Sequence, residues 1–330
     1  MKKLYVLVLP LLLSGLLVSC GGGDDTPKGT YELSYTLNED GLSYAVTGIS
    51  YSNSKATYDV VIPEKYENLP VTTIGKKDAT AGSNNNVFAS DKNLKSLKMS
   101  NSIKEIAGGG LFYKCEKLEK VEFSSSIEEI DAKQVIFRCP AIKEIELPDS
   151  IGKISEDFMN NNDALTKIKL PKNLTSIPHN AFRDNASLKE VIWPEEVFTV
   201  SWTSFVKCGF TEIVMPDNMF FPYGTGARAF ASNDNLTKVT CGRGMQNCPG
   251  LFANCPNLTE FNIKQETVSI YYNGTGEDGA AFSGCTSLHE INYESTKADF
   301  EKIKLDTDFY KRGCNIEVVH CSDGDITYTA

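Results

Sequence analysis

The apolar positions of the chain recur at a regular spacing. The stretch LFYKCEKLEKVEFSSSIEEI, Leu111–Ile130, sets apolar residues at uneven steps among lysines and glutamates, and the chain contains nine frames that align with it. A recurrent period of about 20 to 30 residues predicts a solenoid, in which stacked coils bury a core that no single coil can bury. The lead phenylalanines, at steps of 24, 25, 21, 24, 23, 25, 22 and 30 residues, are Phe88, Phe112, Phe137, Phe158, Phe182, Phe205, Phe230, Phe252 and Phe282.

Each frame predicts one short strand. The consensus is F-x-x-(C/N)-x-x-L-x-x-(I/V)-x-(L/F/I), and its second half alternates polar with apolar residues. In the opening stretch we expect Lys120 and Glu122 to face solvent, and Val121 and Phe123 to face the core. Stacked strands of this kind form a parallel sheet. A proline directly after a strand ends it, because proline lacks the N–H that would continue the ladder. Such prolines are Pro148, Pro171, Pro194 and Pro216.

The first half of the frame also permits a helical turn. In F-x-x-C-x-x-L the apolar residues recur every third position, over a turn or two at most. We therefore expect a short helix or 3₁₀ turn in each coil, facing the sheet. The predicted fold class is an α/β-type repeat solenoid with a parallel β-sheet.

The two ends depart from the repeat, as the caps of a solenoid do. Residues 31–75 contain strand-like runs and predict a β cap, and residues 76–293 predict the solenoid of about nine coils. Residues 294–330 predict a mixed C-terminal cap. There we expect a short helix capped by Ser295 or Thr296, then a strand and a hairpin turn at Asp323-Gly324.

One position of the frame is filled mostly by cysteine or asparagine. Both side chains are compact, and both can hydrogen-bond to nearby backbone inside a tight turn. The pattern predicts a structural ladder of buried residues in which the cysteines are free thiols. The ladder residues are Asp91, Cys115, Cys139, Asn161, Asn185, Cys208, Asn233, Cys255 and Cys285.

The remaining cysteines leave two disulfides open. Cys241 and Cys248 are seven residues apart, as are Cys314 and Cys321, and either pair could be joined in an exported protein. No C-x-x-C motif occurs, so we expect no zinc site, and the sequence predicts no cofactor.

The N-terminus is typical of an exported lipoprotein. Residues 1–19 combine lysines with an apolar run too short to span a membrane, and predict a secretory signal peptide. The sequence LVSC looks like a lipobox, in which Cys20 becomes an N-terminus acylated with palmitate-type chains, and residues 20–30 form a flexible tether. Without Lys2 and Lys3, 31 basic side chains face 43 acidic ones. This charge argues against a nucleic-acid partner.

No catalytic constellation is recognised. The three histidines are His179, His289 and His320, and none accompanies a serine or cysteine in a nucleophile motif. The glutamates of the predicted strands fall in register with lysines, and cross-strand pairing accounts for them. We therefore expect that the chain is not an enzyme.

Departures from the repeat mark the candidate binding residues. Charge along the predicted sheet gives way to Ile192 and Val214, which form a less polar strip. Two coils carry aromatic insertions before their lead phenylalanine, and insertions in solenoids form loops on one face, often the binding face. The alternative is that these aromatic side chains fold back and fill the bulge that they create. The insertion residues are Phe220, Phe221, Tyr223, Tyr271 and Tyr272.

The repeated F-x-x-C-x-x-L-x-x-I-x-L-P frames behind a lipobox resemble the BspA-like leucine-rich repeat family of bacterial surface proteins, from about residue 31 to the C-terminus. The resemblance implies a surface-exposed lipoprotein of the outer membrane that binds a host or bacterial surface protein, as adhesins do. The alternative is a glycan-binding accessory lipoprotein of a polysaccharide-uptake system.

Overall fold

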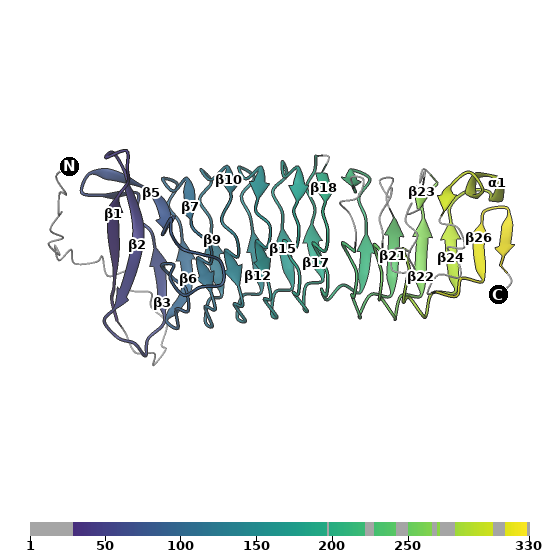
Figure 1. Cartoon of the computed structure of the whole chain (residues 1–330), viewed down its shortest axis with the longest axis horizontal. Helices are drawn as coiled ribbons and strands as arrows, with labels where there is room; N and C mark the ends of the chain where they lie inside the picture. The colour runs from purple at the N-terminus through teal and green to yellow at the C-terminus, as the bar shows by residue number, and fades with distance from the viewer. Residues whose placement is uncertain are drawn as a thin grey trace, which may run out of the picture.

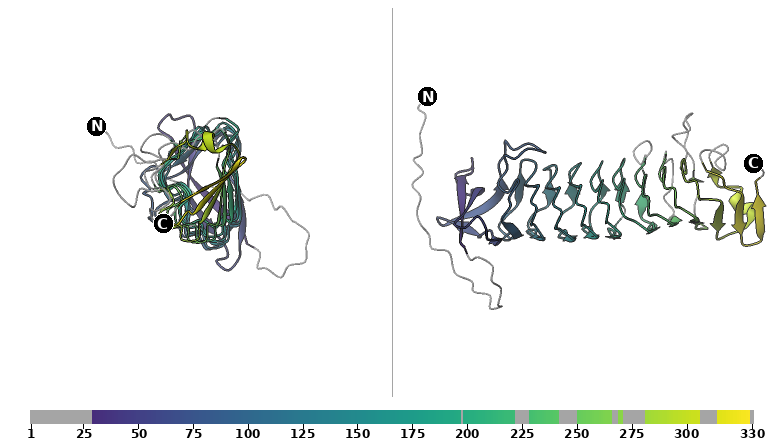
Figure 2. Two further views of the ribbon diagram at one scale, coloured as in Figure 1. Left: turned by 90° about the vertical axis from the view of Figure 1, so that its right-hand side faces the viewer. Right: turned by 90° about the horizontal axis from the view of Figure 1, so that it is seen from below.

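The protein is an elongated stack of coils with a different cap at each end (Figure 1). Viewed along the stack, the coils superimpose around one core (Figure 2). None of the helices described is long and apolar enough to cross a membrane. The computed structural model describes residues 29–196, 198–221, 228–241, 250–265, 269–270, 281–305 and 314–328.

Each coil contributes one strand to a parallel arrangement that we name the first sheet. Strands of neighbouring coils pair in register at most steps, so that Ile145 lies beside Ile168, and Ile168 beside Val191. This confirms the predicted parallel sheet. The strands are β3 (Tyr58–Val61), β6 (Leu94–Lys98), β9 (Lys120–Glu122), β12 (Glu144–Glu146), β15 (Lys167–Lys169), β17 (Glu190–Ile192), β19 (Glu212–Val214), β21 (Lys238–Cys241), β22 (Glu260–Ile263), β24 (Glu290–Tyr293) and β26 (Val318–Cys321).

A second series of short strands follows the first around the coils, and we name it the second sheet. Its strands pair in parallel within separate groups and not as one continuous sheet, as Ser176 does with Thr199. A third ladder consists of β8 (Phe112–Tyr113), β11 (Ile136–Phe137) and β14 (Met159–Asn160). The second sheet comprises β5 (Leu69–Gly75), β7 (Glu105–Ala107), β10 (Glu129–Ile130), β13 (Lys153–Ile154), β16 (Ser176–Ile177), β18 (Phe198–Val200), β20 (Met219–Phe220), β23 (Ser269–Ile270) and β25 (Lys304–Leu305).

The register of the third ladder corrects two lead residues. Ile136 pairs with Phe112 on one side and with Met159 on the other. Ile136 and Met159 are therefore the lead residues of their coils, and the expectation that Phe137 and Phe158 hold these places was wrong. Both errors are of one position, because each coil has two adjacent apolar residues here. The corrected frame is more regular, since the first five steps become 24, 24, 23, 23 and 23 residues.

A tight turn follows every lead residue. Two positions after each lead residue the backbone has a positive φ, a conformation that L-residues adopt mainly in such turns. The turn stands where the sequence predicted a short helix or 3₁₀ turn. The one helix in the described part of the chain is α1 (Lys297–Phe300), in the C-terminal cap. The left-handed residues are Ser90, Lys114, Arg138, Asn161, Asp184, Lys207, Ser232, Asn254 and Gly284.

The residue after each of these turns belongs to the ladder. The Sγ of Cys115 donates a hydrogen bond to the carbonyl oxygen of Phe88, the lead residue of the preceding coil, at 2.9 Å. In the fourth coil of the alignment this residue is Asn162, whereas Asn161, expected here, is the left-handed residue before it. The same bond to the preceding lead carbonyl is made by Cys139, Asn185, Cys208, Asn233, Cys255 and Cys285.

The N-terminal cap continues the sheets of the solenoid. β1 (Tyr31–Leu37) and β2 (Tyr44–Tyr51) form an antiparallel pair, and β2 pairs in parallel with β5 of the second sheet. β4 (Lys65–Tyr66) turns back onto β5. Residues 1–28, which hold the predicted signal peptide and Cys20, lie outside the described residues.

The C-terminal cap combines α1 with a hairpin. Thr296, one of the two expected caps, accepts a hydrogen bond from the backbone N–H of Asp299 at 3.2 Å. β26 pairs antiparallel with β27 (Gly324–Thr327). The turn of this hairpin is Ser322-Asp323, one residue earlier than the expected pair.

Candidate functional site

The outward side chains of the first sheet pair with one another across coils. The Nζ of Lys98 lies 3.3 Å from a carboxylate oxygen of Glu122, and the Nζ of Lys120 lies 2.5 Å from the other. Hydrogen bonds from Lys120 and then Lys98 hold the pKa of Glu122 below its ordinary value. The Glu122 carboxylate is therefore charged and both of its oxygens have partners, which suits a surface network and not acid–base catalysis. Further pairs are Lys167–Glu190, Lys169–Glu146, Lys238–Glu212 and Lys238–Glu260.

The first sheet is interrupted twice. β9 does not pair with β12, and β17 does not pair with β19, although the structure describes all four strands. At the strand end of the neighbouring coils, a leucine or methionine donates its backbone N–H to the next coil. In the two coils before the breaks this residue is aromatic, Phe123 or Trp193, and its N–H makes no such bond within the described segments. An aromatic ring here does not by itself break the sheet, because Tyr293 holds the same position and its strand still pairs with the next one. We therefore attribute each break to the ring together with the packing beneath it. The donors elsewhere are Met99, Leu147, Leu170 and Met215.

The second sheet bridges both breaks. β10 pairs with β13 across the first break, and β16, β18 and β20 pair across the second. The breaks therefore open the first sheet locally and leave the solenoid continuous.

A groove of about 1190 Å³ lies over the first break. Val121, Phe123 and Ile145 give it an apolar lining, and it reaches across β15 to Ile192. Charged side chains from β9, β12 and β15 line it as well. Its size exceeds that of a typical small-molecule pocket, which is about 300–1,000 Å³. The groove is therefore wide enough to hold part of a partner molecule, and the sequence analysis missed it. The aromatic residues at the leucine or methionine position were the available signal.

The strip predicted from the sequence lies beside the second break. Ile192 of β17 is 41% exposed and Val214 of β19 is 54% exposed, both on the outer side of the first sheet. Together with the groove they place apolar surface on a face whose other outward residues are mostly charged or polar. A binding role for these residues stays a prediction.

The two aromatic insertion residues that the structure describes, Phe220 and Phe221, lie in different surroundings. Phe220 is 41% exposed at the end of β20, but Phe221 is 3% exposed, with its ring centroid 6.4 Å from that of Phe230. The ring of Phe221 therefore folds back into the core, which is the alternative that the sequence analysis left open for these residues. The other candidates, Tyr223, Tyr271 and Tyr272, lie outside the described residues.

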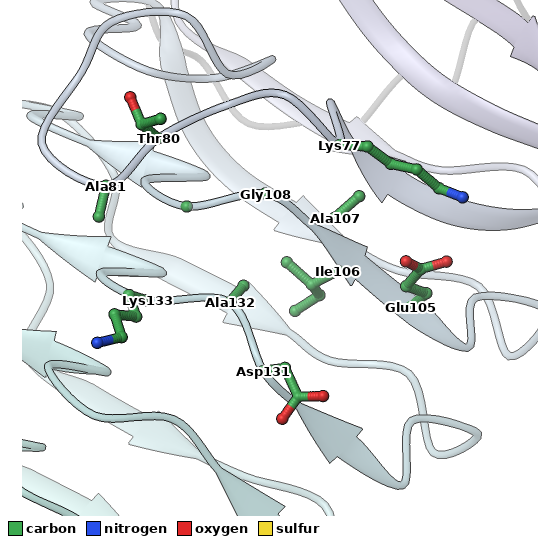
Figure 3. Close-up of a pocket in the computed structure, with 11 residues that line it drawn as sticks. Lys77, Thr80, Ala81, Glu105, Ile106, Ala107, Gly108, Asp131, Ala132 and Lys133 are labelled. Atoms are coloured by element: carbon green, nitrogen blue, oxygen red, sulfur yellow. The ribbon is translucent and has the colours of Figure 1, made fainter.

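A smaller cavity of about 430 Å³ lies beside β7 (Figure 3). Gly109 lines the cavity. The loop before β6 packs so closely on the backbone of Gly109 that a Cβ at this position would lie 2.5 Å from the backbone nitrogen of Ala81. Lys77 and Lys133 point in different directions (Figure 3), and the Nζ of Lys133 pairs with Glu156 at 2.9 Å. The charged groups do not converge, so the cavity offers no catalytic arrangement.

One exposed aromatic residue was not predicted. Trp202 is 47% exposed in the turn after β18, and its indole lies 6.3 Å from the His179 ring in the preceding coil, centroid to centroid. Neither composition nor the repeat consensus distinguishes this tryptophan from a core residue.

The cysteines form no disulfide among the pairs that the structure describes. Cys321 carries a free thiol, so the possible bond from Cys314 to Cys321 is not formed. Cys248, the other candidate partner, lies outside the described residues. Burial raises the pKa of the Cys208 thiol, as expected for an inert structural cysteine. In the part of the chain described, no group of three or more potential ligands could hold a metal ion.

Comparisons with known proteins agree with this architecture. The family model described as "BspA type Leucine rich repeat region (6 copies)" matches residues 53–137, 110–224, 155–275 and 199–327. A search of curated protein sequences found no match.

Solved structures of bacterial repeat proteins are also similar. A leucine-rich repeat protein from Bacteroides ovatus is 17% identical, with a TM-score of 0.48, over 87% of this chain and 80% of that one. A leucine-rich cell surface protein from Faecalibacterium prausnitzii is 18% identical, with a TM-score of 0.45, over 88% and 98%. The pneumococcal vaccine antigen PcpA is 14% identical, with a TM-score of 0.40, over 87% and 95%.

The matches to the family model overlap along almost the whole described chain, and the corrected repeat, the parallel first sheet and the cysteine–asparagine ladder account for them coil by coil. The chain belongs to the BspA-type leucine-rich repeat family.

Proposed function

We propose that this protein is a binding module of the cell surface, anchored through acyl groups on Cys20, and that the outer side of the first sheet binds a partner protein. The observation that carries the proposal is the groove over the first break, together with the exposed Ile192 and Val214 beside the second. Protein interfaces combine an apolar centre with a polar rim, and this face has both.

The charges around the groove favour a polar partner surface that complements them. Most lysines and glutamates here satisfy one another, so they orient a partner more than they attract it. Lys143 and Glu144 differ, because neither makes an ion pair within the described residues. These two side chains are available to a partner at the rim of the groove.

Glycan binding is the second candidate, and Trp202 is the observation that favours it. An exposed indole on a well-fixed turn can stack on the face of a sugar ring, while neighbouring polar groups bind hydroxyls. The backbone carbonyl of Trp202 accepts a hydrogen bond from Asn180 at 3.2 Å, which fixes the turn. His179 and Thr203 are the polar neighbours.

The proposed function is tested with purified protein on immobilised host matrix proteins and on a glycan panel. The double variant Ile192→Ser, Val214→Ser removes the strip. Val61→Ser is the matched control, because Val61 is a 52% exposed valine on the outer side of the same sheet, at β3. Protein binding that the double variant loses and the control keeps supports the proposal. Binding to glycans alone, lost in Trp202→Ala, supports the second candidate and refutes the first.

A further inference from the structure

The second break leaves two strand edges without partners. In a continuous sheet the backbone N–H groups of Trp193, Glu212 and Val214 would bond across to the neighbouring coil. Within the described residues none of them has a hydrogen-bond acceptor, and the N–H of Val191 has none either. Such edges are ready-made templates for another strand.

The two edges are also far apart. Most Cα atoms of β17 lie more than 8 Å from those of β19, and the wider step after β17 is visible in Figure 1. Hydrogen-bonded strands are about 4.8 Å apart, so one inserted strand needs roughly twice that spacing. At the first break several Cα atoms of β9 and β12 lie within 8 Å of each other. The second break is therefore the one that approaches the width of a strand.

The side chains beneath the second break hold it open. The ring of Trp193 packs edge-on against Phe205, with centroids 5.4 Å apart, and Phe210 packs against Phe205 at 6.0 Å. The coil of Phe210 is also one residue shorter between its ladder cysteine and its first apolar position. Gly209 permits this shortening, because a Cβ there would lie 2.4 Å from the carbonyl oxygen of Ala186.

We infer that the slot between β17 and β19 accepts one extended segment of a partner polypeptide, which pairs through its backbone with both edges. This inference rests on the proposed protein-binding function and names the form in which the partner binds. Backbone pairing of this kind supplies affinity, and side chains at alternate positions supply specificity.

The neighbours of the slot define the sequence that it accepts. Inward side chains of the segment must be small, because aromatic rings fill the core below. Outward side chains lie between Glu190 and Glu212 at one level and between Ile192 and Val214 two residues further along. Lys167 and Lys238 each lie against one carboxylate oxygen of these glutamates, at 2.6 and 3.8 Å, so a basic residue suits the second oxygens at the first level. An aliphatic residue suits the second level. The expected pattern is basic–small–aliphatic, read in the direction of β17 for a parallel segment.

Trp193→Leu and Trp193→Met are the decisive variants. Leucine and methionine occupy this position in the coils that stay paired, at Leu170 and Met215, so both variants are expected to fold and to close the slot. Phe123→Leu is the matched control, since it changes the other break and leaves this one.

The first measurement is amide hydrogen exchange of the full protein. We expect the N–H groups of Trp193 and Val214 to exchange rapidly, and those of Leu170 and Met215, which bond to the next coil at 3.0 and 2.9 Å, to exchange slowly. In Trp193→Leu the N–H of Val214 should become slow as well. Slow exchange at the slot in the unaltered protein would mean that the edges are already paired, and would overturn the inference.

The second measurement is selection of a random peptide library displayed on phage. Enriched peptides should show the basic–small–aliphatic alternation, slow the exchange of Val214 when bound, and bind Trp193→Leu at least about tenfold more weakly. Binding to Phe123→Leu should be unchanged. The inference would be refuted if no peptides were enriched over the Trp193→Leu background, or if the enriched peptides bound the unaltered protein and Trp193→Leu equally. The proposed function fails separately, if partner proteins bind the Ile192→Ser, Val214→Ser variant as they bind the unaltered chain.

Discussion

The side-chain amide of Asn233 donates a hydrogen bond to the carbonyl oxygen of Phe205, 3.2 Å away in the preceding coil. Its Nδ2 also donates to the carbonyl of Phe230 in its own coil at 2.6 Å, and its Oδ1 accepts from the N–H of Cys208 at 2.7 Å. A ladder cysteine makes the first kind of bond, and Cys139 adds a longer one, of 3.8 Å, to the carbonyl of Phe137 in its own coil. Asparagine therefore ties two coils together more extensively than cysteine does at the same place.

Asn233→Ala should lower the free energy of unfolding by about 2–3 kcal/mol, since it leaves buried backbone groups without partners. Asn233→Cys should lower it by less, because the bond to Phe205 can be kept. Urea unfolding measures both. The control is Asn257→Ala, at an exposed asparagine one coil later, with an expected loss below about 1 kcal/mol. Equal losses at the two positions would contradict the ladder.

Phe158→Ala should cost about 3–5 kcal/mol of unfolding free energy, although Phe158 is not a lead residue. Its side chain is fully buried, and its ring meets that of Phe182 edge-on at 6.3 Å. Thermal or urea unfolding gives the loss, with the exposed Val214→Ala as the comparison. An unchanged unfolding curve would show that Phe158 is not in the core.

Phe221→Ser and Phe220→Ser should have different effects, although the two residues are adjacent. Removing the buried ring of Phe221 should lower the melting temperature, because a polar group would replace it against Phe230. Replacing the exposed Phe220 should leave the melting temperature nearly unchanged. If Phe220→Ser proves the more destabilising variant, the assignment of which ring fills the core is reversed.

The C-terminal hairpin should become less stable as pH rises above neutrality. Hydrogen bonding to Asp325, and then to Glu290, raises the pKa of His320 above its ordinary value of 6.5. A raised pKa in the folded state means that protonated His320 stabilises the hairpin below about pH 6.5, and that this contribution disappears as pH rises through the raised pKa. Protection factors of the β26–β27 amides, corrected for intrinsic exchange, should fall as pH rises above about 6.5 and level off above the raised pKa. His320→Gln should abolish that dependence, and a dependence that survives the substitution would exclude His320 as its cause.

The repeat was readable from the sequence because each coil repeats the same burial, and the first sheet and the cysteine–asparagine ladder follow from it. Phe137 and Phe158 were misplaced because hydrophobicity alone does not tell Ile136 from Phe137, or Phe158 from Met159. Left-handed turns at Lys114, Arg138 and Lys207 carry no glycine signal.

The site was less predictable than the fold. Ile192 and Val214 are exposed. Their exposure could be predicted because polar residues occupy the same position in most other coils. Each break depends on how one aromatic ring, Phe123 or Trp193, packs between two adjacent coils. The residue types alone do not specify that packing. The exposure of Trp202 depends on the path of a turn, which the residue types around it do not specify.

Because the second sheet bridges both breaks, the stack of coils has a fixed length, and that length sets the distances along it. Since each coil adds about 4.8 Å along the stack, the number of coils before β17 fixes how far Ile192 stands from the N-terminal end. Duplicating or deleting one whole coil in that stretch would move the apolar strip outward or inward by one such step without altering its chemistry. Length variation among proteins built this way would then adjust reach independently of recognition.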